Sequence, residues 1–344
     1  MHPLAGRLAN KAVRRGAGHP ARLAPRARLG QMVAMATRSY PLALDHLVLP
    51  TADLASASAR LSALGFTVAP TGSHPFGTVN RCVYFADGCF LEPLAVGDRD
   101  RCDAAIAEGN VFVARDDVFR GERGQEGFSA IVFATSDAEA DHARYVSGGM
   151  SPGKPLSFAR PFVDANGRTG EASFKLAFAT VAGFDAPFFF ACQRIGVPAV
   201  DRAALEAHEN GASRLAGAIV IAEDPAATRD AIARIAGADD KTATARDAEL
   251  ATLALPNATI EVMRPDAYRH RFGTSPDCGR SGFALIRVEV DDIDVARALL
   301  TSRTIVNRIV GSGLFVPRAA GQGADILFEA GPRETGPTHA GAAS

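Results

Sequence analysis

The chain has 344 residues, of which 47% are hydrophobic and 22% charged, and its formal net charge is −1. This is the composition of an ordinary water-soluble protein, and the length suggests two domains or one domain built from repeats. No apolar run approaches the roughly 20 residues of a membrane span, so we expect no membrane partner. The five cysteines lack metal-type spacings, which favours buried thiols in a reducing cytoplasm over a disulfide framework.

The charge is unevenly distributed along the chain. Residues 1–40 contain eight Lys and Arg and no Asp or Glu. This composition predicts a disordered basic tail or an overcalled start, with an organelle-targeting segment or a nucleic-acid-binding arm as alternatives. The rest of the chain is acidic, which argues against a nucleic-acid partner for the folded part. We also expect a disordered tail at 333–344.

The first folded segment predicts a strand, a helix and three further strands. A short apolar strand at 44–49 precedes Asp53, whose carboxylate can accept hydrogen bonds from the first-turn N–H groups of a helix. Gly65 stands where a left-handed residue closes that helix. The apolar residues of the helix recur at spacings of three and four: Leu54, Ala57, Leu61 and Leu64. The strands that follow are predicted at 66–68, 80–85 and 89–96.

One such βαβββ unit has an open sheet with an uncovered apolar face, so another part of the chain must cover it. The same order of elements recurs three times, and the copies end on strands predicted at 187–193, 258–263 and 325–330. Each helix begins at a cap-like aspartate, and these residues are 84, 87 and 70 positions apart: Asp53, Asp137, Asp224 and Asp294. We therefore predict an α+β fold of four βαβββ modules.

Short segments of the first module carry a family resemblance. The module opens with Asp-His-Leu-Val-Leu-Pro at 45–50 and closes with Phe-Leu-Glu at 90–92. Between them, residues 74–80 read His-Pro-x-Gly-Thr-x-Asn. This arrangement resembles the vicinal oxygen chelate superfamily (glyoxalase, bleomycin-resistance and extradiol dioxygenase proteins), and most closely the glyoxalase-like-domain proteins.

The resemblance implies that paired modules curve their sheets into cups, which gives two fused cup-shaped domains. Modules one and two would form an N-terminal glyoxalase-like domain at 41–200. A linker at 201–212 would lead to a C-terminal domain of modules three and four at 213–332.

The resemblance also implies a metal site, because the superfamily takes its ligands from the first and last strands of each module. In module one those positions hold His46 and Glu92. A neutral imidazole and a carboxylate suit Fe²⁺, Mn²⁺, Ni²⁺ or Zn²⁺ and leave positions open for substrate oxygens. Two protein ligands make a weak site, so we expect His74 or His208 to be the third.

The other modules offer poorer ligands at the corresponding positions. Arginine is never a metal donor at ordinary pH, so the C-terminal cup is expected to be a degenerate, structural copy, and extradiol ring cleavage is disfavoured. Counting from the four aspartates gives Ala130 with Cys192 or Gln193 in module two, Gly217 with Glu261 in module three, and Arg287 with Glu329 in module four.

Polar residues on the strands of module two suggest the ligand. Arginine offers a planar fork suited to carboxylate or phosphate, which favours an anionic small molecule such as a 2-oxo or 2-hydroxy acid. The alternative is that these residues lie on the solvent face and pair with one another. The predicted substrate-binding set is His74, Asn80, Arg160, Arg168 and Lys175.

Two functions follow as alternatives. The favoured one is metal-assisted lyase or isomerase chemistry on a small oxygenated molecule in the N-terminal cup, in a cytoplasmic protein. The other is metal-free binding or sequestration of a small molecule, as in the bleomycin-resistance branch. The sequence assigns no catalytic residue, substrate or particular metal, and a homodimer is a possible assembly.

Overall fold

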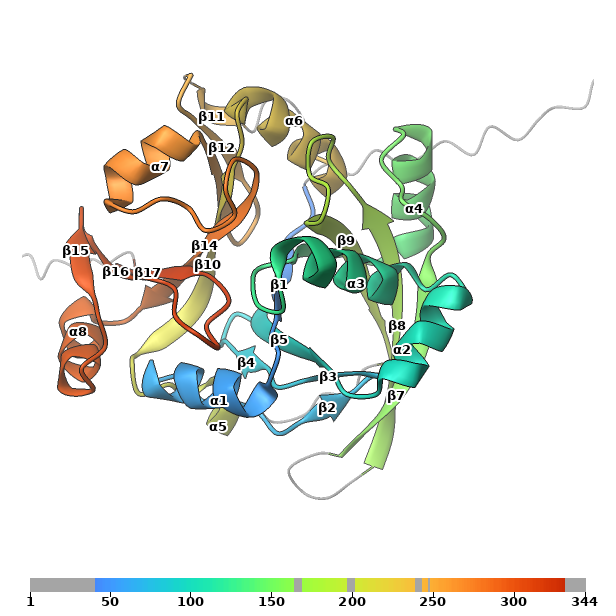
Figure 1. Cartoon of the computed structure of the whole chain (residues 1–344), viewed down its shortest axis with the longest axis horizontal. Helices are drawn as coiled ribbons and strands as arrows, with labels where there is room; N and C mark the ends of the chain where they lie inside the picture. Colours follow the sequence, from blue (N-terminus) through green and yellow to red (C-terminus); the bar gives the residue numbers. More distant parts are fainter. Residues whose placement is uncertain (1–40, 164–168, 197–201, 239–242, 247, 332–344) are drawn as a thin grey trace, which may run out of the picture. The chain divides into compact units, whose positions relative to one another are not determined.

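The computed structural model describes residues 41–163, 169–196, 202–238, 243–246 and 248–331 (Figure 1). All of them belong to one compact unit, Thr37–Ser344. The predicted tails at 1–40 and 333–344 lie outside the described residues. Within the described ranges the chain forms four βαβββ modules in sequence, which confirms the predicted α+β fold.

Module one begins with a helix that is closed as predicted. Asp53 accepts hydrogen bonds from two first-turn N–H groups, and Gly65 has a φ of +93°. The prediction of a strand at 66–68 is wrong. The backbone N–H of Phe66 donates to the last turn of the helix, so it cannot pair with a neighbouring strand. The elements are β1 (Leu44–Pro50), α1 (Leu54–Ala63), β2 (Gly72–Ser73), β3 (Thr78–Asn80), β4 (Val83–Tyr84) and β5 (Phe90–Val96).

Module two follows after two helices that the sequence pattern did not predict. They are α2 (Arg99–Ala107) and α3 (Val111–Arg123). The module itself consists of β6 (Ala130–Ala134), α4 (Ala138–Ser147), β7 (Leu156–Val163), β8 (Thr169–Ala179) and β9 (Phe188–Ile195). Modules one and two share one sheet in the order β2-β3-β5-β1-β6-β9-β8-β7, with β4 beside β5.

Modules three and four form a second sheet in the order β11-β12-β13-β10-β14-β17-β16-β15. Module three comprises β10 (Ala212–Ile221), α6 (Pro225–Ala236), β11 (Ala243–Arg246), β12 (Leu250–Ala254) and β13 (Thr259–Met263). Module four comprises β14 (Gly282–Val290), α8 (Ile293–Ser302), β15 (Arg308–Val310), β16 (Gly313–Val316) and β17 (Asp325–Ala330). Two further helices are α5 (Ala203–Glu206), within the predicted linker, and α7 (Pro265–Phe272).

Strand pairing in the two sheets follows one rule. The first strand of every module pairs in parallel with the last strand of the same module. The first strands of partner modules, β1 with β6 and β10 with β14, pair antiparallel at the centre of each sheet. The predicted pairing of modules is therefore present, while the division into two domains at residues 201–212 stays a prediction.

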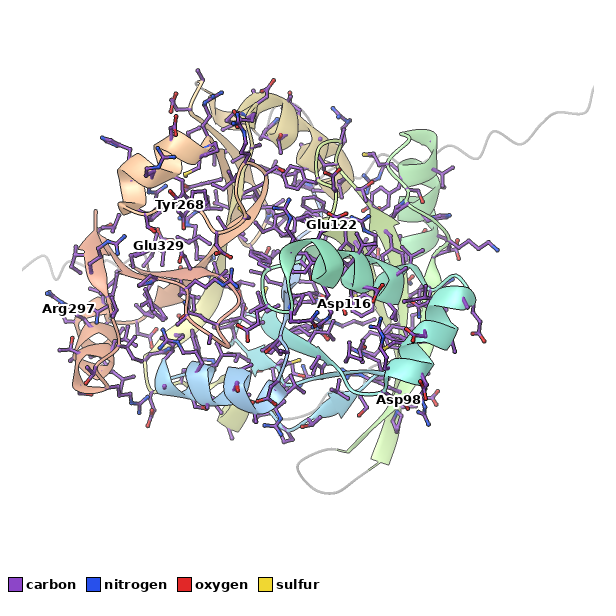
Figure 2. All side chains as sticks on the ribbon, viewed as in Figure 1. Asp98, Asp116, Glu122, Tyr268, Arg297 and Glu329 are labelled. Carbon is purple, nitrogen blue, oxygen red and sulfur yellow. The ribbon has the colours of Figure 1, made fainter. Side chains whose placement is uncertain are left out.

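The hydrophobic core has three parts. The largest part joins both sheets to the four module helices α1, α4, α6 and α8, and it includes Leu61 and Leu64. A second part lies between the other face of the first sheet and helices α2 and α3. The third packs α7 on the second sheet, with the fully buried ring of Tyr268 at its centre (Figure 2).

Two expectations from composition can be compared with this structure. All five cysteines are free thiols, four of them buried and Cys278 half-buried. Among the helices of the described ranges, none has the length and apolar character to cross a membrane.

Candidate functional site

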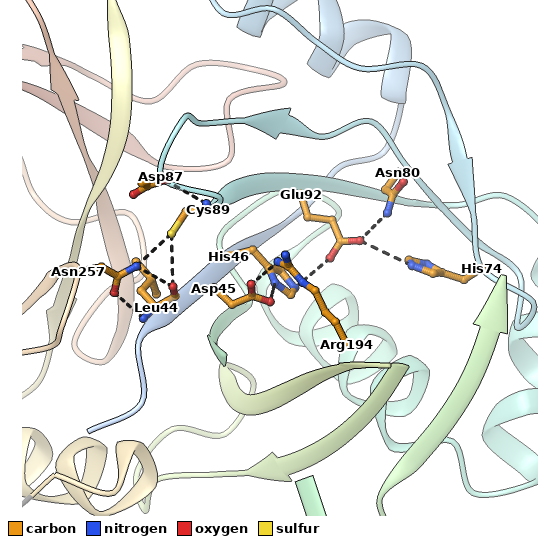
Figure 3. A network of polar contacts seen from close by, with 10 residues as sticks. All are labelled: Leu44, Asp45, His46, His74, Asn80, Asp87, Cys89, Glu92, Arg194 and Asn257. Carbon is orange, nitrogen blue, oxygen red and sulfur yellow. Dashed lines mark hydrogen bonds and ion pairs between the residues drawn. The ribbon is translucent and has the colours of Figure 1, made fainter. Parts of the chain in front are cut away.

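A buried polar cluster surrounds Glu92 on β5, on the face of the first sheet that α3 covers (Figure 3). Oε2 of Glu92 lies 3.5 Å from Nε2 of His46, and Oε1 lies 3.8 Å from Nε2 of His74. Asn80 donates a hydrogen bond of 2.6 Å from Nδ2 to Oε1. The structure thus brings three of the other predicted residues, His46, His74 and Asn80, around the carboxylate of Glu92.

A bulge in β1 places two neighbouring side chains in the same cavity. Leu44 lies opposite Phe133 on β6, but His46 lies opposite Val132, so Asp45 is an extra residue. A bulge breaks the alternation of side chains, and both Asp45 and His46 line the cavity as a result. Asp45 was missed in the sequence because strict alternation assigns it to the opposite face.

Arg194 on β9 completes this part of the cluster. Its guanidinium forms an ion pair with Asp45 and lies 5.5 Å from the ring centre of Phe90. Arg194 was also missed, although it follows Cys192 by two residues and therefore shares the cavity-facing side of β9. That alternation was the signal that could have found it.

The hydrogen bond from His46 to Asp45 decides which ring nitrogen of His46 faces the carboxylate of Glu92. Nδ1 of His46 lies 3.0 Å from Oδ2 of Asp45. An ionised carboxylate only accepts hydrogen bonds, so Nδ1 must donate, and the lone pair of a neutral ring then lies on Nε2, toward Glu92. A second partner that holds a histidine in this way is a common feature of metal sites.

His74 lies in the loop between β2 and β3, and its ring is neutral. Burial of the ring, followed by the Coulombic effects of Arg160 and His46, lowers the pKa of His74 from 6.5 to about 3. Its Nδ1 lies 2.8 Å from Oγ1 of Thr78, which fixes the ring with Nε2 toward Glu92. Two imidazole nitrogens therefore face one buried carboxylate, and these are the donor groups of a divalent metal site.

The side chains of His46, His74 and Glu92 do not form a complete coordination sphere in this structure. No three His, Cys, Asp or Glu side chains within the described ranges stand in a geometry ready to hold an ion. The two histidines face different oxygens of Glu92, so binding by all three would require the side chains to shift. The distances of 3.5 and 3.8 Å are nevertheless close to the roughly 3.0–3.6 Å between two ligands about 2.1 Å from one ion.

The cavity beside these groups is small and mostly aromatic. Its volume is about 50 Å³. The ring of His46 stacks on Phe90 with centres 4.2 Å apart, and that of His74 stacks on Phe76 at 5.0 Å. Arg160 also reaches the cavity and forms no ion pair with any residue that the structure describes. The phenylalanines of the lining are Phe76, Phe90, Phe112, Phe158, Phe174 and Phe190.

Three other predicted site residues are not part of this cluster. Lys175 points to the opposite face of β8, where its Nζ lies 3.0 Å from Glu139 on α4. His208 uses both ring nitrogens elsewhere: Nδ1 accepts from the N–H of Thr67, and Nε2 lies 3.0 Å from the carbonyl oxygen of Tyr84. Arg168 lies outside the described residues.

The strand register corrects the ligand position in module two. Val48 on β1 pairs with Glu92, and the equivalent Val132 on β6 pairs with Phe190. The residue that corresponds to Glu92 is therefore Phe190, and not Cys192 or Gln193. The rings of Phe190 and His46 pack edge to face with their centres 5.5 Å apart. Module two therefore contributes an apolar side chain to the cavity in place of a metal ligand.

The register also corrects module four. The helix N-cap is Asp292 and not Asp294. His46 precedes its cap, Asp53, by seven residues, and the same count from Asp292 leads to Leu285. Since Leu285 pairs with Asp325, the counterpart of Glu92 is Leu327.

Arginine occupies the corresponding region of the C-terminal sheet. Arg287 lies opposite Gly217, the counterpart of His46 in module three. Its guanidinium is 3.1 Å from Glu261 and 2.7 Å from Glu329. Arg287 therefore neutralises the carboxylates of Glu261 and Glu329.

A sequence profile of the glyoxalase-like domain family matches residues 44–236, more than half of the chain. The chain belongs to the glyoxalase-like domain family. Its paired βαβββ modules give it the fold of the vicinal oxygen chelate superfamily. No curated protein matches this glyoxalase-like protein significantly.

Solved structures share the fold at low sequence identity. A hypothetical protein from Staphylococcus aureus superposes with a TM-score of 0.57 at 16% identity, covering 83% of this chain and 98% of its own. A triple mutant of 4-hydroxymandelate synthase from Streptomyces coelicolor gives 0.55 at 15% identity, covering 85% of this chain and 92% of its own. At these identities the likeness concerns the fold alone.

Proposed function

We propose that this glyoxalase-like protein binds a divalent metal ion at His46, Glu92 and His74 and acts on a small oxygenated anion. One observation carries the proposal: two imidazole nitrogens, Nε2 of His46 and Nε2 of His74, face a carboxylate that is only 5% exposed. A buried carboxylate is costly without a compensating partner. A divalent ion would satisfy all three groups.

The surrounding residues would have distinct roles. Asp45 and Thr78 orient the two imidazoles, and Asn80 holds Glu92 through its amide. A bound divalent ion would serve as a Lewis acid that polarises a substrate oxygen. The aromatic lining excludes water from this region.

The cavity also indicates what kind of molecule would bind. Arg160 offers a guanidinium to a carboxylate at the polar edge of the cavity. A volume of about 50 Å³ favours a compact molecule, such as a short 2-oxo or 2-hydroxy acid. The reaction class that we propose is metal-assisted lyase or isomerase chemistry.

The test measures metal binding directly. Wild-type protein, His46→Ala and Glu92→Gln would be analysed for bound metal and for the rise in melting temperature with Mn²⁺, Ni²⁺, Zn²⁺ and Fe²⁺. The control is His270→Ala, which removes an exposed histidine of α7. We expect binding in the wild type and the control, with loss of binding in both site variants. Equal, negligible metal content in all four proteins would refute the proposal.

A metal-free binding protein is the second candidate. It is favoured by the aromatic lining and by the lack, within the described ranges, of a ready-made three-ligand arrangement. Calorimetry with small carboxylates in the presence of a chelator separates the two candidates. Binding that persists in chelator and is weakened by Arg160→Ala would favour sequestration over metal-assisted chemistry.

A further inference from the structure

The start of β1 is held by a side chain from the second sheet (Figure 3). Asn257 lies in the turn between β12 and β13. Its Oδ1 accepts a hydrogen bond of 2.8 Å from the N–H of Leu44, and its Nδ2 donates one of 2.9 Å to the carbonyl oxygen of Leu44. Leu44 directly precedes Asp45 and His46, the two residues that the bulge turns into the cavity.

Asn257 takes the place of a neighbouring strand at this point. The pairing of β1 with β5 begins only at His46 and Phe90, so β5 does not reach Leu44. A side-chain amide offers one acceptor and one donor, as a peptide group in a strand does. Cys89 supports the contact, since its Sγ lies 3.3 Å from both the carbonyl oxygen of Leu44 and Nδ2 of Asn257.

The turn that carries Asn257 is itself fixed. Pro256 restricts the backbone before it, and the N–H of Leu255 donates to the carbonyl oxygen of Ala258 at 2.8 Å. Arg214 donates from Nη1 to the carbonyl oxygen of Asn257 at 3.3 Å and forms an ion pair with Glu289. The amide therefore reaches β1 from a rigid support.

The two halves make this contact reciprocally but not equally. The carboxylate of Asp87, in the turn between β4 and β5, interacts with the backbone N–H of Leu215 on β10, and the N–H of Ala86 donates to the carbonyl oxygen of Ser213 at 3.2 Å. A bulge follows Leu215 just as one follows Leu44. A carboxylate can only accept, whereas the amide of Asn257 both accepts and donates. The two-sided side-chain contact thus falls on the strand that carries His46.

We propose that Asn257 is a positioning residue for the metal site, which makes the C-terminal half part of that site's support. The inference rests on the proposed function. By fixing both backbone groups of Leu44, Asn257 holds the bulge that aims Asp45 and His46 at Glu92. Loss of the amide would let the bulge relax, and the orientation of the His46 ring would change with it.

The experiment uses the full chain with Asn257→Ala and a matched control, Asn210→Ala. Asn210 is a buried amide that, like the half-buried Asn257, makes two backbone contacts: it donates to Leu64 and accepts from Ala212, both at 2.9 Å. Mn²⁺ affinity and the visible absorption spectrum of bound Co²⁺ are measured for each protein. We expect Asn257→Ala to weaken Mn²⁺ binding about tenfold and to alter the Co²⁺ spectrum, as loss of an outer support typically does. Asn210→Ala should leave both unchanged even if it lowers the melting temperature.

The outcomes separate this inference from the proposed function. If the wild type binds metal and Asn257→Ala binds it equally well with the same Co²⁺ spectrum, the inference is overturned. If the wild type binds no metal, the proposed function fails, and hydrogen exchange at residues 44–48 then tests whether Asn257 holds the bulge of β1. Exchange that is faster in Asn257→Ala but not in Asn210→Ala supports the inference. Unchanged exchange in Asn257→Ala overturns it. Should Asn257→Ala not fold, Asn257→Asp retains the acceptor without the donor and replaces it in every comparison.

Discussion

At the scale of single residues, the protonation of buried histidines depends on what each ring nitrogen contacts. His208 illustrates this away from the cavity. Its Nδ1 accepts from the N–H of Thr67, so it must carry no proton, while Nε2 donates to the carbonyl oxygen of Tyr84. Burial lowers the pKa of His208, although the hydrogen bond to Tyr84 acts in the opposite direction. The folded state therefore favours the neutral ring.

This predicts a pH dependence of stability. The pKa of His208 is lower in the folded than in the unfolded protein, so its contribution is present above about pH 6.5 and is lost as the pH falls. Between pH 6.5 and 5, the wild type should lose more of its unfolding free energy than His208→Gln does. Urea titrations of chelator-treated protein at both pH values measure the difference. Parallel losses in the two proteins would show that His208 does not titrate differently on folding.

At the scale of elements, the residue at which a helix begins decides the register of a whole module. Asp292 accepts hydrogen bonds from the N–H groups of Asp294 and Val295 at 2.8 and 3.4 Å and so caps α8. Asp294 lies in the first turn, where a negative charge is favourable next to the N-terminus of the helix. Since this cap is two residues earlier than its predicted position, the counterparts of His46 and Glu92 become leucines.

Paired substitutions in α8 distinguish the cap from the first-turn residue. Asp292→Ala should destabilise the protein by about 1 kcal/mol, because two N–H groups lose their acceptor. Asp294→Ala should cost about half as much or less, since it removes only a favourable charge near the helix N-terminus. Chemical unfolding of both variants gives the comparison. A larger loss of unfolding free energy in Asp294→Ala than in Asp292→Ala would instead favour Asp294 as the cap, the position expected from the sequence.

At the scale of the whole molecule, the largest core joins the two sheets. Phe283 on β14 packs against three phenylalanines of the first half, with Phe128 and Phe189 at ring-centre distances of 4.9 and 5.2 Å. Phe66 and Phe328 stack across the halves in the same way, at 5.9 Å. Separation of the two sheets would expose this apolar core to water.

The shared core predicts cooperative unfolding. Phe283→Ala should cost about 3–5 kcal/mol, the usual range for a buried phenylalanine, and should lower a single transition that both halves share. Calorimetry together with hydrogen exchange in β1 and β17 tests this. Two separate transitions, with only the C-terminal one shifted, would instead support halves that unfold independently.

Local patterns in the sequence were enough to predict the four modules. Alternation within strands, apolar stripes at helical spacing and cap residues such as Asp53 and Asp224 are set by neighbours in the chain, so they can be read without tertiary contacts. The same alternation is compatible with His46 and Glu92 on the cavity-facing sides of β1 and β5, although the bulge separates Leu44 from the face of His46. Resemblance to a family then suggested why a histidine and a carboxylate should meet there.

Tertiary structure decided the rest of the site. The bulge at Asp45 is a property of how β1 pairs with β6, and the position of His74 depends on a loop that folds over the sheet. Helix α3 closes the cavity with Phe112, which no local signal connects to His46. Asn257 reaches Leu44 across 213 positions of the chain. Contacts of this kind leave no trace in local periodicity, because the partners meet only after both sheets have formed.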